Sequence, residues 1–295
     1  MIFDALPVAR ARYAPALAGL VALCLTAARP APLDAQTSPA PAGVIAPPPP
    51  SSGDTAKTFF TRRDLSYGGI ALASTLVFTA FDVRIAHWMA QPNVQGGTSR
   101  HRVMQTLSDY TGETTLTAAT VLGYGIGLVS HNKTTAAVSL HMIEAQALTS
   151  VMGQAVRGVL GRARPSASPN DAHALHWGKG FSTFDDRAFP SLHSAAGFII
   201  ASGVTEELRY RAPGAVPFVA PALYAAALVP GVVRMYLQQH WASDVVAGAF
   251  LGNFIGARVV QYTHTHQPSR LDRILLGSSV SANRDGASFS VHMTR

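Results

Sequence analysis

The sequence has few charged residues for its length. Asp, Glu, Lys and Arg make up 13% of the 295 residues, whereas hydrophobic residues make up 48%. An ordinary soluble domain has a charged fraction of about 25%, so this composition indicates a membrane protein or a deeply buried helical one. The mean hydropathy of +0.19 is modest, and composition alone leaves both interpretations open.

Cysteine and lysine are scarce as well. Cys24 is the single cysteine, which excludes an intrachain disulfide and a cysteine-based metal site. Only three lysines are present (Lys57, Lys133 and Lys179), so the net charge of +7 rests on arginine. An excess of basic residues suits anionic partners. Nucleic acid is not predicted among them, because the basic residues form no run and are not interleaved with aromatic residues.

The N-terminal region predicts a signal peptide over residues 1–35. Arginines precede an apolar stretch at 16–28, and a small-residue cleavage site follows at 33–35. An uncleaved membrane anchor is the alternative. Residues 36–56 are rich in Pro, Ala and Ser, a composition typical of a semi-extended linker.

Residues 57–262 predict a helical body. Apolar segments rich in Ala, Gly and Leu recur there without strand-like alternation, which indicates helices. The six segments are 66–81, 115–130, 134–158, 191–207, 215–233 and 243–262. Few of them reach the ~20 apolar residues of a clean membrane-spanning helix. The predicted fold class is therefore an all-α six-helix bundle, membrane-embedded or membrane-associated. The tail, 263–295, has short alternating stretches around Asp285-Gly286 that predict a β-hairpin; a loosely ordered tail is the alternative.

The stretch VVRMYLQQHWASDVV places Arg234, His240 and Asp244 in an otherwise apolar or uncharged run. Charged groups are costly to bury without partners. His240 and Asp244 are four residues apart, a spacing that brings them together on one helix face. A carboxylate beside an imidazole fixes its tautomer and leaves the other ring nitrogen free as base or nucleophile. Taken alone, such a pair is more often a structural hydrogen bond.

A second cluster, PSLHS at 190–194, opens the fourth apolar segment. Ser191 and His193 thus lie near a predicted helix N-terminus, where backbone N–H groups and the helix dipole favour an anion. His193 is positioned to give up a proton. Ser191 adds a hydroxyl donor, or serves only as an N-cap.

A third cluster, RGVLGRARP at 157–165, carries Arg157 and Arg164 about two helical turns apart. Two guanidinium groups near an anion pocket suit a tetrahedral oxyanion, because each offers charge-assisted, bidentate hydrogen bonds. Arg162 is interpreted as a spare residue that can equally face solvent.

Together the clusters read R-x6-RP, PSxH and R-x5-H-x3-D, in that order. This pattern resembles the phosphatidic acid phosphatase type 2 / vanadium haloperoxidase superfamily, whose signature is K-x6-RP, PSGH and SR-x5-H-x3-D. The matching positions are Arg164, Pro165, Pro190, Ser191, His193, Arg234, His240 and Asp244. Residue usage of about 5% each makes a chance match improbable. Three positions depart from the signature: Arg157 replaces lysine, Leu192 replaces glycine and Val233 replaces serine.

The resemblance implies a catalytic role for each motif. His240 would attack phosphorus and form a phosphohistidine, Asp244 would support His240, and His193 would protonate the leaving oxygen and then activate water. The resemblance assigns binding of the phosphoryl oxygens to Arg157, Arg164, Ser191 and Arg234. It implies no cofactor and no metal. Leu192 is the departure expected to lower activity.

The remaining histidines are given no catalytic role. His173 and His176 lie in the long loop between the first two motifs, where a metal site with Asp171 or Asp185 is conceivable but is not predicted. The loop itself, with Trp177 and Phe181, is the better candidate for substrate selection. His264 and His266 are interpreted as exposed residues.

The leading function is a phosphatase of lipid phosphates or isoprenoid pyrophosphates. A soluble periplasmic acid phosphatase, a vanadate-dependent haloperoxidase and a non-enzymatic binding protein are the alternatives. The predicted partners are a phosphorylated lipid or small molecule and a membrane; the sequence does not indicate an oligomeric state.

The predicted location is the bacterial cell envelope, with the active site facing the periplasm. If the signal is cleaved and all six segments span, however, the first motif falls on the cytoplasmic side. Fewer spans, an N-terminus inside the cell, or a soluble helical domain would each remove this conflict.

Overall fold

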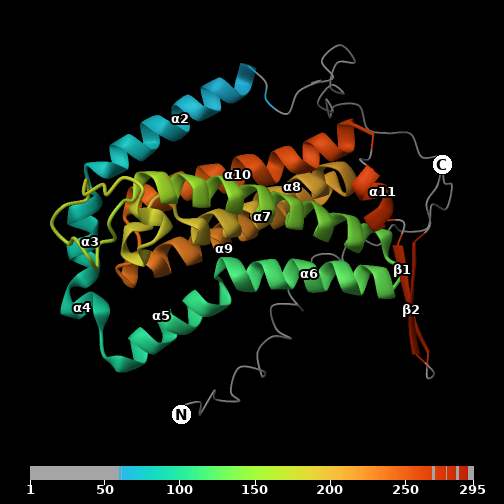
Figure 1. Cartoon of the computed structure of the whole chain (residues 1–295), viewed down its shortest axis with the longest axis horizontal. Helices are drawn as coiled ribbons and strands as arrows, with labels where there is room; N and C mark the ends of the chain where they lie inside the picture. Colours follow the sequence, from blue (N-terminus) through green and yellow to red (C-terminus); the bar gives the residue numbers. More distant parts are fainter. Residues whose placement is uncertain (1–59, 61, 268–269, 277, 284–285, 292–295) are drawn as a thin grey trace, which may run out of the picture.

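The computed structural model describes residues 60, 62–267, 270–276, 278–283 and 286–291, drawn as ribbon or in colour in Figure 1. The predicted signal peptide and linker lie outside the described residues.

Six long helices correspond to the six predicted segments, and the all-α bundle is confirmed. They are α2 (Arg62–Thr79), α6 (Glu113–Val129), α7 (Lys133–Leu160), α8 (Leu192–Arg211), α9 (Val216–Tyr236) and α10 (Ala242–Thr265). Three helices between α2 and α6 were not predicted: α3 (Asp82–Ala90), α4 (Pro92–Gln95) and α5 (Thr98–Tyr110). Short 3-10 turns are η2 (Lys179–Phe181), η3 (Phe184–Asp186) and η4 (Pro213–Ala215).

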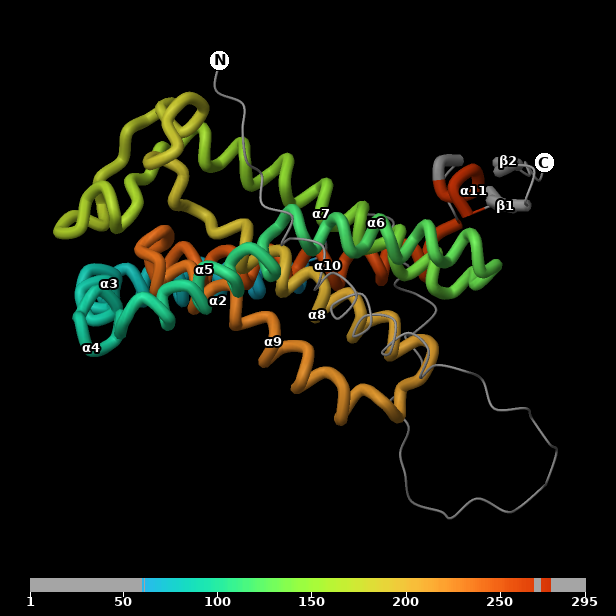
Figure 2. Tube along the Cα trace, turned by 90° about the horizontal axis from the view of Figure 1, so that it is seen from below, coloured from blue at the N-terminus to red at the C-terminus, as the bar shows by residue number. Residues whose placement is uncertain are grey.

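Helices α7, α8 and α10 lie side by side along the long axis of the molecule (Figures 1 and 2). Helix α6 packs against α7, and α9 packs against α8. The loop after α7 lies with α3 at one end of the bundle, whereas α11 (Arg270–Leu276) lies at the other (Figure 1). Beside α11, strands β1 (Ser278–Asn283) and β2 (Gly286–Val291) pair antiparallel.

Local sequence signals set the helix ends that matter for the site. Gly161 ends α7 in the left-handed conformation, with φ +57°, which glycine adopts without steric cost. The side chain of Ser191 caps α8 by accepting a hydrogen bond from the backbone N–H of Ser194. Helix α9 begins at Val216 with a proline in its first turn.

A stripe of glycines on α10 allows α8 to approach very closely. A Cβ at Gly252 would lie 2.1 Å from the carbonyl oxygen of Ala195, and one at Gly248 would lie 2.2 Å from that of Ser191. Gly256 continues the stripe one turn further along. Small residues four apart permit this backbone contact. The stripe therefore fixes the N-terminal end of α8 against the N-terminal end of α10.

Two helices in the described part of the chain are long and apolar enough to cross a membrane: Pro213–Tyr236, which contains α9, and Ala242–Thr265, which is α10. Helices α2 and α3, bent by 58° at the break between them, form a third candidate if they are one span. Large exposed apolar side chains on α2, α6 and α9 suit contact with lipid: Leu65, Leu72, Leu76, Val121, Leu122, Ile126 and Phe218.

We expect Gly252→Ala to destabilise the bundle. The added methyl group would overlap backbone of α8, and overpacking a tight core costs about 1–3 kcal/mol. The midpoint of thermal unfolding in detergent should fall by about 2–10 °C.

Gly69→Ala on α2 is the matched control, because nothing lies within 4 Å of a Cβ there. Alanine favours a helix over glycine by about 1 kcal/mol, so this variant should be as stable as the parent or more so. Equal midpoints for the two variants would contradict the close contact of α8 and α10.

Candidate functional site

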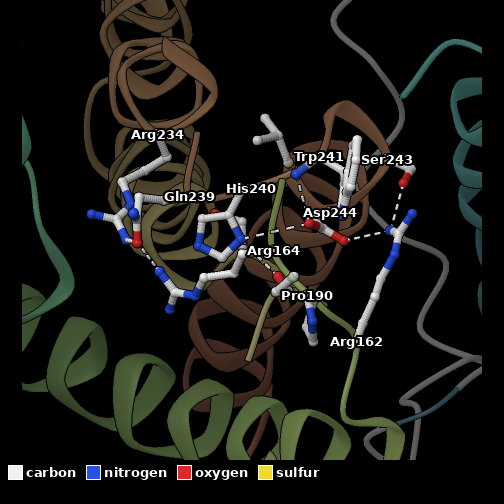
Figure 3. A network of polar contacts seen from close by, with 12 residues as sticks. Arg162, Arg164, Pro190, Arg234, Gln239, His240, Trp241, Ser243 and Asp244 are labelled. Atoms are coloured by element: carbon white, nitrogen blue, oxygen red, sulfur yellow. Dashed lines mark hydrogen bonds and ion pairs between the residues drawn. The ribbon is translucent and has the colours of Figure 1, made fainter. Parts of the chain in front are cut away.

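The residues predicted for the site gather at the end of the bundle where α3 lies. They are Arg157, Arg164, Ser191, His193, Arg234, His240 and Asp244. Arg157 is on the last turn of α7, and Arg164 is in the loop after it. Ser191 and His193 begin α8, Arg234 ends α9, and the other two residues lie at the start of α10. Four helix ends thus supply one site, and Figure 3 shows Arg164, Arg234, His240 and Asp244 within it.

His240 lies just before α10 and is buried. Its Nδ1 lies 2.7 Å from the carbonyl oxygen of Ala188. A carbonyl can only accept, so Nδ1 carries the hydrogen and Nε2 presents a lone pair. Asp244 Oδ2 faces the same Nδ1 from 3.7 Å, beyond hydrogen-bonding distance. The backbone carbonyl of Ala188, rather than Asp244, therefore fixes the tautomer.

The carboxylate of Asp244 is held by other groups. It accepts hydrogen bonds from the backbone N–H of Trp241 at 2.7 Å and from Arg162 Nη1 at 2.5 Å. Figure 3 shows Arg162 reaching Asp244 from the side opposite His240. The first of these contacts caps α10 at its N-terminus.

Arg162, interpreted from the sequence as a spare residue that can equally face solvent, is instead buried and paired. Its side chain is 6% exposed and makes an ion pair with Asp244 and a second, at 2.7 Å, with Asp82 on α3. Asp82 also accepts hydrogen bonds from the backbone N–H and the hydroxyl of Ser243. A buried guanidinium needs such partners because removing it from water is costly.

Several buried nitrogen atoms at this end have no hydrogen-bond partner among the described residues. They belong to both histidines and two of the arginines: His240 Nε2, His193 Nδ1, Arg157 Nη2 and Arg234 Nε. Arg187 Nε, from the loop before α8, is a further one. Leaving a buried donor unpaired costs about 1–3 kcal/mol. Such a concentration is typical of a binding site rather than of a folded core.

Gln239 links two of the predicted anion-binding residues. Its Oε1 accepts hydrogen bonds from Arg164 Nη1 and, at 3.3 Å, from Arg234 Nη2 (Figure 3). Arg164 also donates to the carbonyl of Phe184 and lies 3.8 Å from the centre of its ring. The amide oxygen thus contacts both guanidinium groups, as an oxygen of a bound oxyanion would.

Burial and neighbouring arginines make this site unfavourable for further positive charge. Burial first, and the arginines second, hold the pKa of His240 well below its ordinary value, and burial lowers the pKa of His193 in the same way. Burial and two other arginines lower the pKa of Arg164 to about 9. A bound anion would oppose all of these effects.

Ser191 and Leu192 lie at the start of α8. The hydroxyl of Ser191 caps α8, and its backbone N–H donates to the carbonyl of Asp244. Of the two roles considered for Ser191, the N-cap is the one that these contacts match. Leu192, which replaces the glycine of the signature, is buried. A Cβ at Gly153 of α7 would lie 2.3 Å from Leu192 Cδ2. Because Gly153 leaves this room, the leucine side chain packs between α7 and α8.

The loop between the first two motifs presents exposed aromatic residues beside the site. Trp177 is 66% exposed and Phe181 is 64% exposed. His176 Nδ1 contacts Asp186 at 2.7 Å, and not the Asp171 or Asp185 considered from the sequence. In the described part of the chain, the group of side chains placed to hold a metal lies elsewhere, at the far end of the bundle.

Comparison with known proteins agrees with this arrangement. Residues 136–268 match the family model of the PAP2 superfamily. The chain is similar to the crystal structure described as the first transmembrane PAP2 type phosphatidylglycerolphosphate phosphatase from Bacillus subtilis, with a TM-score of 0.51 and 17% identity. The match covers 71% of this chain and 100% of that one, and at this identity it shows a shared fold. No curated protein matches the chain in sequence. The matched segment contains all three motifs, so the resemblance that the motifs indicated is confirmed over residues 136–268.

Proposed function

We propose that the protein is a phosphatase that hydrolyses phosphomonoesters or pyrophosphates through a phosphohistidine on His240. The observation that carries this proposal is the set of buried, unpartnered nitrogen atoms from separate elements, on His193, His240, Arg157 and Arg234. A phosphoryl group is an anion that can satisfy these nitrogen atoms together. The match to the model of the PAP2 superfamily supports the same class of reaction.

The arginines bind the phosphoryl group and stabilise its charge. Three arginines from different elements lie close enough for their charges to lower the pKa of both histidines: Arg157, Arg164 and Arg234. Phosphoryl transfer depends mainly on positioning and charge stabilisation, and three guanidinium groups supply these without a metal. Gln239 yields its contacts with Arg164 and Arg234 to the phosphoryl oxygens.

The two histidines act from opposite sides of phosphorus. Their ring centres are 6.3 Å apart, so both rings can contact one phosphoryl group, His240 at phosphorus and His193 at the leaving oxygen. The lone pair of His240 Nε2 forms the N–P bond while the bond to the leaving oxygen breaks, and His193 gives that oxygen a proton. His193 then takes a proton from water, whose oxygen attacks phosphorus. The N–P bond breaks and phosphate leaves.

Asp244 acts through position and charge. Held by Arg162 and capping α10, it keeps a carboxylate 3.7 Å from His240 Nδ1. A negative charge at this distance stabilises the positive charge that the imidazole gains as its other nitrogen bonds to phosphorus. This role does not require a hydrogen bond.

The proposed substrate is a lipid phosphate or an isoprenoid pyrophosphate. Two candidate membrane spans end at the site, since α9 ends with Arg234 near it and α10 begins beside it. Exposed Trp177 and Phe181 suit the boundary between water and lipid. The similar structure is described as a transmembrane PAP2 type phosphatidylglycerolphosphate phosphatase. We propose a position in the cell envelope with this end of the bundle facing the periplasm.

His240→Ala is expected to lower kcat/KM for a lipid phosphate by at least about 10³-fold, because the nucleophile is lost. The measurement is phosphate release in mixed micelles. His173→Ala is the matched histidine control: His173 is an exposed loop residue, so activity should be retained. His193→Ala with an activated aryl phosphate should accumulate an acid-labile, histidine-linked phosphate. Its absence, or activity in His240→Ala, would contradict the mechanism.

The activity should be highest at acidic pH. Because burial lowers the pKa of His193 and His240, both are neutral near pH 7 before an anion binds. The second pKa of a phosphomonoester is about 6, and only the monoanion brings the proton that His193 passes to the leaving oxygen. A pH series of kcat/KM should fall about tenfold per unit above about pH 6. A rise between pH 6 and 8 would contradict this sign.

Arg162→Gln should lower both stability and turnover. It leaves the buried carboxylates of Asp82 and Asp244 without their cation, a change that costs about 3–5 kcal/mol. We expect a lower thermal midpoint, and kcat reduced more than KM is raised. Arg102→Gln on α5, at an exposed position, is the control and should change neither. Equal behaviour of the two variants would exclude the buried network as the support of the site.

A further inference from the structure

A second cluster of potential ligands lies at the opposite end of the bundle from the phosphate site. His141 of α7, Glu207 of α8 and His264 of α10 place one ligand atom each within 4.8 Å of one another. His141 precedes Arg157 on the same helix by about 24 Å, at 1.5 Å per residue. The proposed phosphatase reaction uses none of these three side chains.

Both histidines already contact the carboxylate of Glu207. His141 Nδ1 lies 2.5 Å from Glu207 Oε1, and His264 Nε2 lies 3.1 Å from Glu207 Oε2. Arg211, one turn beyond Glu207 on α8, also contacts Oε2, at 2.7 Å. The side chains of His141 and Glu207 are 10% and 3% exposed, while that of Arg211 is 32% exposed. Arg211 can therefore turn toward solvent while the other two stay buried.

The rings of both histidines are held by their surroundings. The ring of His264 stacks on that of Tyr210, with centres 4.1 Å apart and planes at 12°. The ring of His141 meets that of His264 edge to face, with centres 6.0 Å apart. Their positions on three packed helices, rather than on loops, predispose the ring nitrogens to remain close. His264 is thus exposed in part, as expected from the sequence, but it is not without contacts.

Further carboxylates lie near the cluster, each with a partner of its own. Glu144 lies on α7 one turn after His141 and interacts with Asp272 of α11. Glu206 pairs with Arg209, and Glu207 pairs with Arg211. A metal ion at Glu207 would therefore take the place of Arg211 as the partner of that carboxylate.

We propose that His141, Glu207 and His264 bind one Zn²⁺ ion, which ties α7, α8 and α10 together. Two imidazole nitrogens and a carboxylate oxygen form a donor set that zinc accepts, with water as the fourth ligand. Oxygen-preferring Mg²⁺ and Ca²⁺ fit the two histidines poorly. Small rotations bring the ligand atoms to about 2.0–2.2 Å from the metal, and Arg211 releases Oε2 as the metal binds. The role is structural, because the ion is remote from the phosphoryl group.

The test uses the full-length protein without an affinity tag, in detergent, after chelation and dialysis. Zn²⁺ is added, bound metal is counted by elemental analysis, and the thermal midpoint is followed. We expect one ion per chain and a midpoint that rises with zinc concentration. Co²⁺ in place of Zn²⁺ should give the visible absorption of a tetrahedral nitrogen–oxygen site. Absence of stoichiometric binding at micromolar Zn²⁺ would overturn the proposal.

Three variants locate the ion. His264→Ala leaves the Arg211–Glu207 pair intact and should still fold, but should lose the bound metal and the zinc-dependent rise of the midpoint. Glu207→Gln should lose them as well. His87→Ala is the control, because His87 is an exposed residue of α3 and should leave both unchanged. Full binding by His264→Ala and Glu207→Gln would place the metal elsewhere and overturn the proposal.

Discussion

The candidate site depends on one buried ion-pair network, in which Arg162 bridges Asp82 and Asp244. The guanidinium connects α3, the loop after α7 and the first turn of α10. Each partner is almost fully removed from solvent, so the charges are tolerable only as a set. Asp244 then caps α10 through the N–H of Trp241, which fixes the chain entering that helix. His240 lies immediately before this point, and its position follows from the network.

The site also requires close contact between α8 and α10, and glycines on α10 allow that contact. Gly248 and Gly252 let α10 touch the backbone of α8, so the helix start carrying His193 meets the one carrying Asp244. Leu192 on α8 is larger than the glycine of the signature, and its side chain occupies the space that Gly153 leaves on α7. The departure from the family signature is thus matched by a small residue on the neighbouring helix. For this reason a leucine there is compatible with the helix packing around the site.

The sequence predicted the features that are encoded locally. Apolar segments indicated the long helices, PSLHS indicated the start of one of them, and the three motifs together indicated that the histidines and arginines share one site. The network around Arg162 was missed because Asp82 is remote in sequence and nothing in GRARP shows which arginine turns inward. A lone aspartate in TAFDVRIAHW was the available signal. The contact from Ala188 to His240 was also beyond prediction, since a backbone carbonyl has no residue-specific pattern.

Charged residues are few, and two groups of charged and titratable side chains lie at opposite ends of the bundle. Where α7 ends and α8 begins, buried arginines and histidines leave donors unpaired, and the local field favours an anion. Toward the start of α7 and the end of α8, Glu207 and two histidines form a donor set that suits a metal ion. The same three helices carry both clusters, so apolar packing between them separates groups that would otherwise neutralise one another. A bundle with charged residues spread evenly along its helices could hold neither kind of ligand site. The low charged fraction is therefore consistent with two separate clusters of charged side chains, one at the candidate site and one at the opposite end.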